Sequence, residues 1–330
     1  MKKELIVVIA FVSIINSYGQ THENYNKNGL VKYNQKDYAG AILYYTKAIK
    51  ENPNDTAAYT DRGDVKFDLQ DYNGAVTDYT KVIEIDPNYA KSYFSRGFAK
   101  NYLNDFSSAI KDFTKAIEIN PNYSEAYVNR GIAKDNLEDY KGALDDYSKF
   151  IELKPKQAIG YYLKGLVKSN LQDFKGAILD FSKAIEINPK DASFYSNRGV
   201  AKRKLKDYNG AIIDYDISIK LNPDISGTYY YRGLSKNYLK DKKGAITDYN
   251  KAIHIDPKHE EYYYNRGTTK AMLKDYNGAI ADYTKAIEIN PNYAEAYYER
   301  GRVKAKSKKF KDGFEDYKKA KELNRNLKFK

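Results

Sequence analysis

The sequence predicts an all-α solenoid built from nine tandem helix pairs of 34 residues each. Its eight prolines are spaced 34 residues apart: Pro53, Pro87, Pro121, Pro155, Pro189, Pro223, Pro257 and Pro291. Nine glycines keep the same spacing: Gly29, Gly63, Gly97, Gly131, Gly165, Gly199, Gly233, Gly267 and Gly301. No insertion interrupts the period, and a fixed period of this size indicates stacked structural repeats.

Each repeat reads as helix A, a short turn, helix B and a second turn. In residues 260–293, Ala279, Tyr283 and Ala286 recur at helical spacing along helix B. Pro291 ends that helix, because proline forces the residue before it out of the α region. An aspartate at the first turn is expected to cap helix B in each repeat. These residues are Asp37, Asp71, Asp105, Asp139, Asp173, Asp207, Asp241 and Asp275.

The glycine in the middle of every helix A needs a compensating contact, since it costs about 0.5–1 kcal/mol relative to alanine. We expect a close approach of helix B, with a small residue facing the glycine: Ala41, Ala75, Ala109, Ala143, Ala177, Ala211, Ala245 and Ala279. Aromatic rings at one position of helix A and one of helix B, such as Tyr195 and Tyr215, should fill the surrounding space. Each buried ring contributes about 1.5–3 kcal/mol, which outweighs the glycine.

The order of residues within the repeat resembles the tetratricopeptide repeat. Counted from His22, an aromatic stands at the fourth position, Gly at the eighth, an aromatic at the seventeenth, Ala at the twentieth, an aromatic at the twenty-fourth and Pro at the thirty-second. The resemblance covers His22–Leu327 and implies a right-handed α-solenoid whose concave groove, lined by the A helices, binds a peptide or protein. The repeats are 22–55, 56–89, 90–123, 124–157, 158–191, 192–225, 226–259, 260–293 and 294–327.

The two ends of the chain differ from the array. Residues 1–19 have a basic start, an apolar run Leu5–Ile15 and small residues at Ser17 and Gly19, as in a cleaved export signal. We expect an exported protein, periplasmic or extracellular, that does not span the membrane after cleavage; an uncleaved anchor is the open alternative. The last repeat, 294–327, lacks the proline and reads as a degenerate cap, followed by a basic tail end at 328–330.

The sequence lacks the residues that catalysis or metal binding would need. The chain has no cysteine and three histidines, and it carries no nucleotide, protease or zinc-binding motif. We therefore expect no enzyme activity, no catalytic residues, no cofactor and no metal. Arginines such as Arg62 and Arg300 recur at one position and are expected to pair with helix B aspartates such as Asp78, Asp180 and Asp282. If exposed, each pair would contribute about 0–1 kcal/mol, and these acids argue against nucleic acid as a partner.

Variable aromatic residues on helix A are the candidate binding residues. The resemblance places positions 2, 5, 6, 9, 12 and 13 of each repeat in the groove, and exposed aromatics there are typical of peptide recognition. The candidates are Phe94, Phe98, Tyr102, Tyr162, Tyr230, Tyr231, Tyr238, Tyr264 and Tyr298. We expect the main contact around Tyr230, Tyr231, Tyr264 and Tyr298. Packing between neighbouring A helices is the alternative, above all for the ninth position.

Two functions follow from these observations. The first is a non-enzymatic scaffold that binds a peptide segment or partner protein in an envelope or secretion assembly. The carboxylate clamp of chaperone-binding family members is absent, because the fifth position is never Lys and the ninth is never Asn. The second is binding of an acidic protein, polyanion, anionic lipid or glycan through Arg300–Lys330, which carries a net charge of +9. A solvated C-terminal cap is the plainer interpretation of that charge.

Overall fold

The structure is a computed structural model that describes residues 22–307 and 310–324. The predicted export signal and tail end lie outside these residues. The described chain contains α-helices joined by short turns, and no strand is found within it. Two compact units divide it at Lys156 and Gln157. The predicted all-α solenoid is therefore confirmed within each unit.

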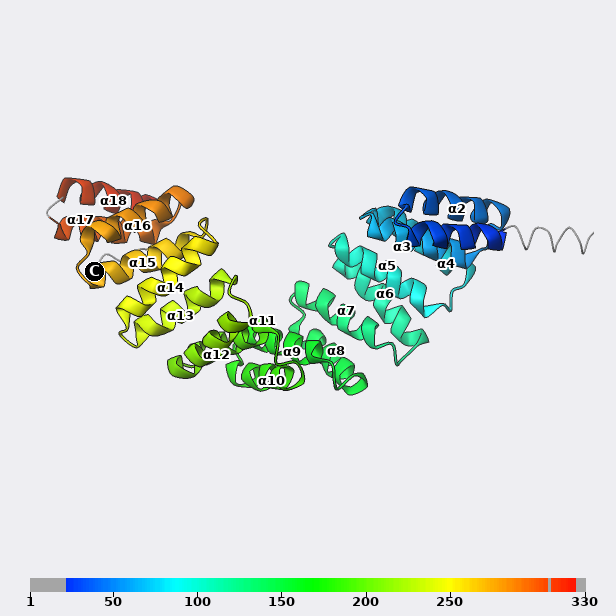
Figure 1. Ribbon diagram of the computed structural model, residues 1–330, viewed down its shortest axis with the longest axis horizontal. Helices are drawn as coiled ribbons and strands as arrows, with labels where there is room; N and C mark the ends of the chain where they lie inside the picture. The colour runs from blue at the N-terminus through cyan, green and yellow to red at the C-terminus, as the bar shows by residue number, and fades with distance from the viewer. Residues whose placement is uncertain (1–21, 308–309, 325–330) are drawn as a thin grey trace, which may run out of the picture. The chain divides into compact units, whose positions relative to one another are not determined.

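The first unit contains eight helices between residues 22 and 156 (Figure 1). They are a helix at residues 22–34, α2 (Tyr38–Glu51), α3 (Thr56–Asp68), α4 (Tyr72–Ile85), α5 (Ala90–Tyr102), α6 (Phe106–Ile119), α7 (Ser124–Asn136) and α8 (Tyr140–Leu153). Odd-numbered elements are A helices and even-numbered elements are B helices. From α3 onward, each A helix packs on the B helix of its own repeat, and each B helix packs on the A helix that follows within the unit.

The second unit contains ten helices arranged by the same rule (Figure 1). They are α9 (Ala158–Asn170), α10 (Phe174–Ile187), α11 (Ala192–Lys204), α12 (Tyr208–Leu221), α13 (Ser226–Tyr238), α14 (Lys242–Ile255), α15 (Glu260–Met272), α16 (Tyr276–Ile289), α17 (Ala294–Lys306) and α18 (Phe310–Leu323). None of the described helices has both the length and the apolar character needed to cross a bilayer.

The predicted aspartate caps of the B helices are confirmed. In α12, for example, the Asp207 carboxylate accepts a hydrogen bond from the Gly210 backbone N–H at 2.9 Å. All eight predicted aspartates make this bond to the residue three positions later, at 2.9–3.2 Å. Each therefore satisfies a backbone donor that the first turn of a helix would otherwise leave unpaired.

The glycine of helix A does lie in a close contact, but its partner is not the one expected. A Cβ added at Gly199 would come within 2.6 Å of the Tyr215 ring. The helix B ring is likewise nearest to Gly29, Gly63, Gly97, Gly131, Gly165 and Gly233. We expected the alanine side chain of helix B to contact the glycine, and this prediction is wrong. Ala245 is fully buried, but it approaches Gly233 through its backbone oxygen, which lies 3.2 Å from the Cβ position of that glycine. The glycine thus makes room for an aromatic ring.

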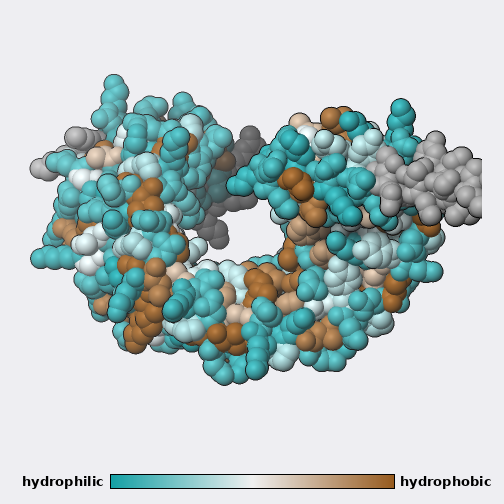
Figure 2. Space-filling model, turned by 45° about the vertical axis from the view of Figure 1, so that its right-hand side comes forward, coloured by the Kyte–Doolittle hydropathy of each residue, from teal (hydrophilic) through white to brown (hydrophobic). Residues whose placement is uncertain are grey.

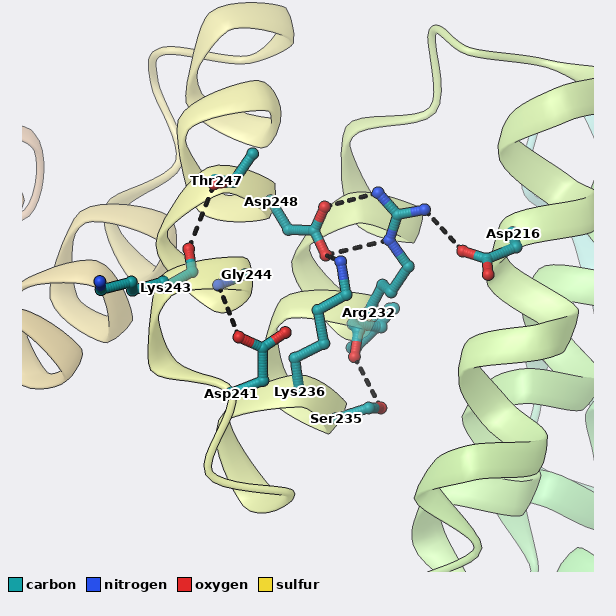
Figure 3. A network of polar contacts seen from close by, with 10 residues as sticks. Asp216, Arg232, Ser235, Lys236, Asp241, Lys243, Gly244, Thr247 and Asp248 are labelled. Atoms are coloured by element: carbon teal, nitrogen blue, oxygen red, sulfur yellow. Dashed lines mark hydrogen bonds and ion pairs between the residues drawn. The ribbon is translucent and has the colours of Figure 1, made fainter.

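The arginine and aspartate ladders form one buried network in each of seven repeats. Arg232 donates from Nε and Nη2 to the two carboxylate oxygens of Asp248, and Lys236 donates to the same carboxylate at 2.8 Å (Figure 3). Asp248 is only 2 % exposed. Burial alone would lower the pKa of Arg232, but its contacts with Asp248 and Asp216 raise it above the ordinary value. The predicted pairing of these arginines with helix B aspartates is therefore confirmed for Asp248, and the low energy of an exposed pair does not apply because the carboxylate sits between the two helices.

The same arginine also joins its repeat to the one before. Its Nη1 donates to a side chain sixteen residues earlier, on the preceding B helix, as Arg130 does to Thr114 and Arg232 does to Asp216. The arginine–aspartate pairs are Arg62–Asp78, Arg96–Asp112, Arg130–Asp146, Arg198–Asp214, Arg232–Asp248, Arg266–Asp282 and Arg300–Asp316. One residue therefore links three helices.

The repeat at residues 158–191 has no arginine–aspartate pair of this kind, and we expect that restoring one would stabilise the chain. Lys164 stands at the arginine position, and Asp180 is held by Lys168 at 2.7 Å rather than by an arginine as expected. Lys164→Arg should restore the two-pronged pair and stabilise the chain by about 1 kcal/mol. Thermal unfolding checks this, with Lys251→Arg at an exposed site of α14 as the matched control. Equal melting temperatures for both variants would contradict the role given to the arginine.

Candidate functional site

The A helices form a continuous face in each unit. Neighbouring A helices touch one another directly: α5 with α7, α9 with α11, α11 with α13, α13 with α15, and α15 with α17. Most of each hairpin's own packing is between A and B helices, so the side of the A helices turned away from the B helices is free to meet a partner. The nine candidate residues lie on this layer, but the structure gives them unequal exposure.

Aromatics at the fifth position pack within the solenoid. The Phe94 ring lies 5.8 Å from Phe113 on its own B helix and 5.0 Å from Tyr123, the residue that immediately precedes α7 of the next repeat. The Tyr264 ring has the equivalent neighbours Tyr283 and Tyr293 at 5.8 and 5.0 Å. Burial raises the pKa of Tyr264 to about 12. These half-buried rings therefore stabilise the joint between repeats and leave only an edge for a partner.

Tyr162 and Tyr298 follow the same pattern. Tyr162 lies 5.9 Å from Phe181 and 4.9 Å from Phe194, and its hydroxyl accepts a hydrogen bond from Asn197. Tyr298 lies 5.5 Å from Tyr317 of α18. Both rings are half-buried.

Tyr230 does not meet the expectation of an exposed anchor. Its side chain is 8 % exposed. Its hydroxyl donates a hydrogen bond to Glu261 at 3.2 Å and accepts one from Asn265 at 3.1 Å. Burial raises its pKa far above the ordinary value. The neighbouring Tyr231 is half-buried, 5.2 Å from the Tyr230 ring, with the Arg203 guanidinium above it. The prediction that Tyr230 is part of the main contact with a partner is therefore corrected. This ring packs between two repeats.

Tyr102 and Tyr238 are the candidate rings that face solvent, at 53 % and 63 % exposed. Each stands at the thirteenth position and stacks on the tyrosine that begins the preceding B helix. Tyr102 lies 5.0 Å from Tyr72, and Tyr238 lies 4.7 Å from Tyr208 with the two planes 5° apart. Stacking fixes each exposed ring in one orientation, so a partner can bind it at a small cost in side-chain entropy.

A pocket of about 420 Å³ opens beside Tyr102 in the first unit. It is lined by Phe98, Asn101, Tyr102, Asn104, Phe106, Asn129, Ile132 and Asn136. Phe98 lies 5.3 Å from both Phe67 and Tyr102, so its apolar wall is a packed aromatic cluster. On the side of the molecule drawn in Figure 2, the apolar residues (brown) form separate patches among hydrophilic ones (teal).

Asparagine oxygens supply the polar wall of this pocket. Asn129 and Asn136 each use the side-chain nitrogen to donate to a carbonyl of their own helix. Asn101 has a buried side-chain oxygen with no hydrogen-bond partner in the described part of the chain. A buried acceptor left unpaired is unfavourable, by about 1–3 kcal/mol. Because this oxygen is shielded from solvent, a donor such as the N–H of a bound backbone reaches it when the Asn101 side chain turns toward the pocket.

The residue at the twelfth position was missed as a candidate. Asn237 repeats the arrangement of Asn101: its side-chain oxygen is also buried and unpartnered among the described residues, and Tyr238 follows it. The signal was present in the sequence, because residues 100–103 and 236–239 both read Lys-Asn-Tyr-Leu. A comparison of whole helices between repeats would have found it.

A smaller hollow in the first unit is acidic. It measures about 90 Å³ and is lined by Leu30, Tyr33, Tyr45, Asp61, Asp64 and Val65. Burial raises the pKa of Asp61 and of Asp64, and Tyr79 donates to Asp64 at 2.6 Å. No group of three or more residues suited to holding a metal ion occurs within the described ranges.

Family models match most of the chain. A model described as TPR repeat matches residues 63–101, 169–206 and 271–308. Models described as tetratricopeptide repeat match residues 22–55, 90–123, 113–145, 192–225, 226–259 and 294–327. No curated protein sequence gives a significant match.

Solved structures with the same fold include the MamA protein, at 28 % identity over 53 % of this chain and 96 % of that one, with a TM-score of 0.50. A tetratricopeptide repeat protein from Parabacteroides merdae is 20 % identical over 77 % of this chain and 98 % of that one, with a TM-score of 0.58. The C-terminal part of a TPR repeat-containing protein from Cytophaga hutchinsonii is 19 % identical over 71 % and 96 %, with a TM-score of 0.59. The last two likenesses show the fold alone.

Proposed function

The chain belongs to the tetratricopeptide repeat family, and from that premise we propose that it is a non-enzymatic scaffold that binds a peptide segment of a partner protein. The segment lies along the A helices, where the exposed aromatics and the unpaired amide oxygens are found. Binding of this kind uses a few aromatic anchors and main-chain hydrogen bonds. It needs no reactive group.

The pocket beside Tyr102 is the observation that carries this proposal. It combines an aromatic wall that includes Phe98 with an unpaired acceptor on Asn101. An extended peptide supplies both complements, an apolar side chain for the wall and a backbone N–H for the oxygen. Its volume of about 420 Å³ suits a few peptide side chains better than a whole domain.

A photo-crosslinking experiment tests this function. p-Benzoylphenylalanine is placed at Tyr102 of the full chain, and cells that make the protein natively are irradiated. We expect discrete cross-linked species that disappear when a Phe98→Ala and Asn101→Ala pair is added, since loss of an anchor and its hydrogen bond should weaken binding at least tenfold.

The matched control carries the crosslinker at Leu43, an equally exposed residue of the B helix α2. No partner should be captured there. Cross-links of equal yield at Leu43 and Tyr102, or cross-links at Tyr102 unaffected by the paired substitution, would contradict binding at the A-helix face.

The setting that we propose is an exported one, in an envelope or secretion assembly, on the ground of the signal pattern in residues 1–19. The alternative of an acidic partner, polyanion, lipid or glycan at the last repeat receives less support. Arg300 and Lys304 are held by Asp316, and Arg302 is held by Glu299, so part of the basic charge there is already compensated.

A further inference from the structure

Arg203 differs from the other arginines of the described chain. Nine arginines are described, and eight of them form ion pairs: Arg62, Arg96, Arg130, Arg198, Arg232, Arg266, Arg300 and Arg302. No carboxylate of the described residues pairs with Arg203. Its charge therefore has no carboxylate partner in the part of the chain that the structure describes, where the other arginines are all paired.

Arg203 lies where a bound segment would pass. It stands at the twelfth position of its repeat, near the end of the A helix α11, and its guanidinium lies 5.2 Å from the ring centre of Tyr231 on the neighbouring A helix α13. The side chain is half-buried, and its Nε is shielded from solvent with no well-aligned acceptor in the described part of the chain. The Tyr215 hydroxyl lies within hydrogen-bonding reach of the guanidinium, so a ligand would have to bind at the terminal nitrogens. One face of the cation is thus covered by an aromatic ring.

The groups around Arg203 do not neutralise it. Asp214, the ladder aspartate of the same repeat, is already held by Arg198 and Lys202. Burial raises the pKa of the Tyr215 phenol far above its ordinary value, and the nearby Arg203 charge opposes that rise without reversing it. Tyr215 therefore stays neutral at physiological pH, so it is no counter-ion.

We propose that Arg203 binds the side-chain carboxylate of an aspartate or glutamate within a peptide segment lying along the A helices of the second unit. The planar guanidinium can donate two parallel hydrogen bonds to a carboxylate, and partial burial against Tyr231 makes that pair stronger than an exposed one. Exposed Tyr238 and the unpaired oxygen of Asn237, both on α13, can hold the residues beside the acid. This inference rests on the proposed function.

A single cation selects a carboxylate rather than a phosphate. Phosphate is doubly charged near neutral pH, and protein sites for it usually gather several cations or backbone N–H groups. Two basic residues adjoin Arg203 on α11. Lys202 is engaged by Asp214 at 2.8 Å, and the exposed Lys204 is turned about 100° away from Arg203 around the helix. Arg203 is therefore the cation that lies against Tyr231.

Peptide selection from a random twelve-residue library displayed on phage tests this assignment, with the full chain as the target. We expect wild-type protein to enrich peptides that carry Asp or Glu at a fixed place. Arg203→Glu should enrich peptides with Lys or Arg at that place instead. Lys251→Glu, which makes the same change in net charge at an exposed residue of the B helix α14, should select the wild-type consensus.

Binding of one selected peptide then gives the size of the contact. Arg203→Met should lower the affinity for the selected peptide about ten- to a hundredfold. Replacing the peptide's Glu with Gln should lower the affinity of the wild-type protein by a similar factor. Combining the two changes should lower the affinity little further, because both remove the same contact. Circular dichroism and the melting temperature verify that the variants fold.

Four results would overturn the assignment. An acidic preference unchanged in Arg203→Met would place the acid elsewhere, and a peptide bound more tightly with phosphoserine at the acidic place would make the site a phosphate site. If wild-type protein enriches no peptide at all, the proposed function fails together with this inference. Enriched peptides with no acidic preference overturn the Arg203 assignment alone.

Discussion

Asp248→Ala should destabilise the chain by about 3–5 kcal/mol, the usual loss when one partner of a buried ion pair is removed. The carboxylate is 2 % exposed and accepts from both Arg232 and Lys236 (Figure 3). Without it, Lys236 has no ion-pair partner among the described residues, and Arg232 keeps only Asp216. Urea unfolding followed by circular dichroism measures the change.

Glu288→Ala is the matched control for this prediction. Glu288 forms an exposed ion pair with Lys285 one helical turn away, at 3.0 Å, and such pairs contribute about 0–1 kcal/mol. A similar loss of stability in the two variants would mean that the buried network contributes no more than a surface pair, and the account of repeat-to-repeat linkage would be wrong.

Gly199→Leu is expected to lower stability by about 1–3 kcal/mol or more, because its first side-chain atom would lie 2.6 Å from the Tyr215 ring. Leucine favours helices by about 0.8 kcal/mol over glycine, so local propensity opposes the effect and only the clash can produce the loss. Thermal unfolding should show a lower midpoint, confined to the neighbouring repeats if they unfold separately.

Gly227→Leu gives the comparison that isolates the clash. Gly227 also lies in an A helix, but a Cβ there would meet only the edge of Tyr231 at 4.0 Å. This variant should be neutral or slightly stabilised. A melting temperature for Gly199→Leu as high as that of Gly227→Leu would show that the helices do not approach closely at the glycine.

The fold could be predicted from the sequence because a tandem repeat supplies many copies of one pattern. Pro291 and its equivalents mark the turns, Asp275 and its equivalents mark the start of helix B, and their spacing never changes. A solenoid makes most of its contacts between neighbours in the chain. Local spacing therefore determines the helices and their order within each unit.

Partners across the helix pair were harder to predict. The sequence shows that Gly199 recurs at one position, but not that the Tyr215 ring covers it before the alanine does. The sequence also shows that an arginine and an aspartate recur sixteen residues apart, as Arg232 and Asp248 do. It does not show that the Asp248 carboxylate is buried, or that Lys236 binds the same carboxylate. These facts depend on how the two helices are rotated about their axes, which a periodic pattern leaves undetermined.

The candidate site was predicted at the level of the layer rather than of its residues. Aromatics at the fifth position, such as Phe94 and Tyr230, were expected on the surface, but the following repeat covers them. Tyr102 and Tyr238 stay exposed because the thirteenth position lies near the end of the helix. Arg203 could not be singled out from the sequence, because only the structure shows that the other described arginines form ion pairs and that Arg203 does not.

The central claim is that a partner segment lies along the A helices. A crystal structure of the full chain bound to a library-selected peptide tests it most directly. The account predicts an extended peptide across neighbouring A helices, in contact with Tyr102 and Asn101 in the first unit or with Arg203 and Tyr238 in the second. A peptide seated on the B helices, or at the turns near Asn188 and Asn222, would contradict it.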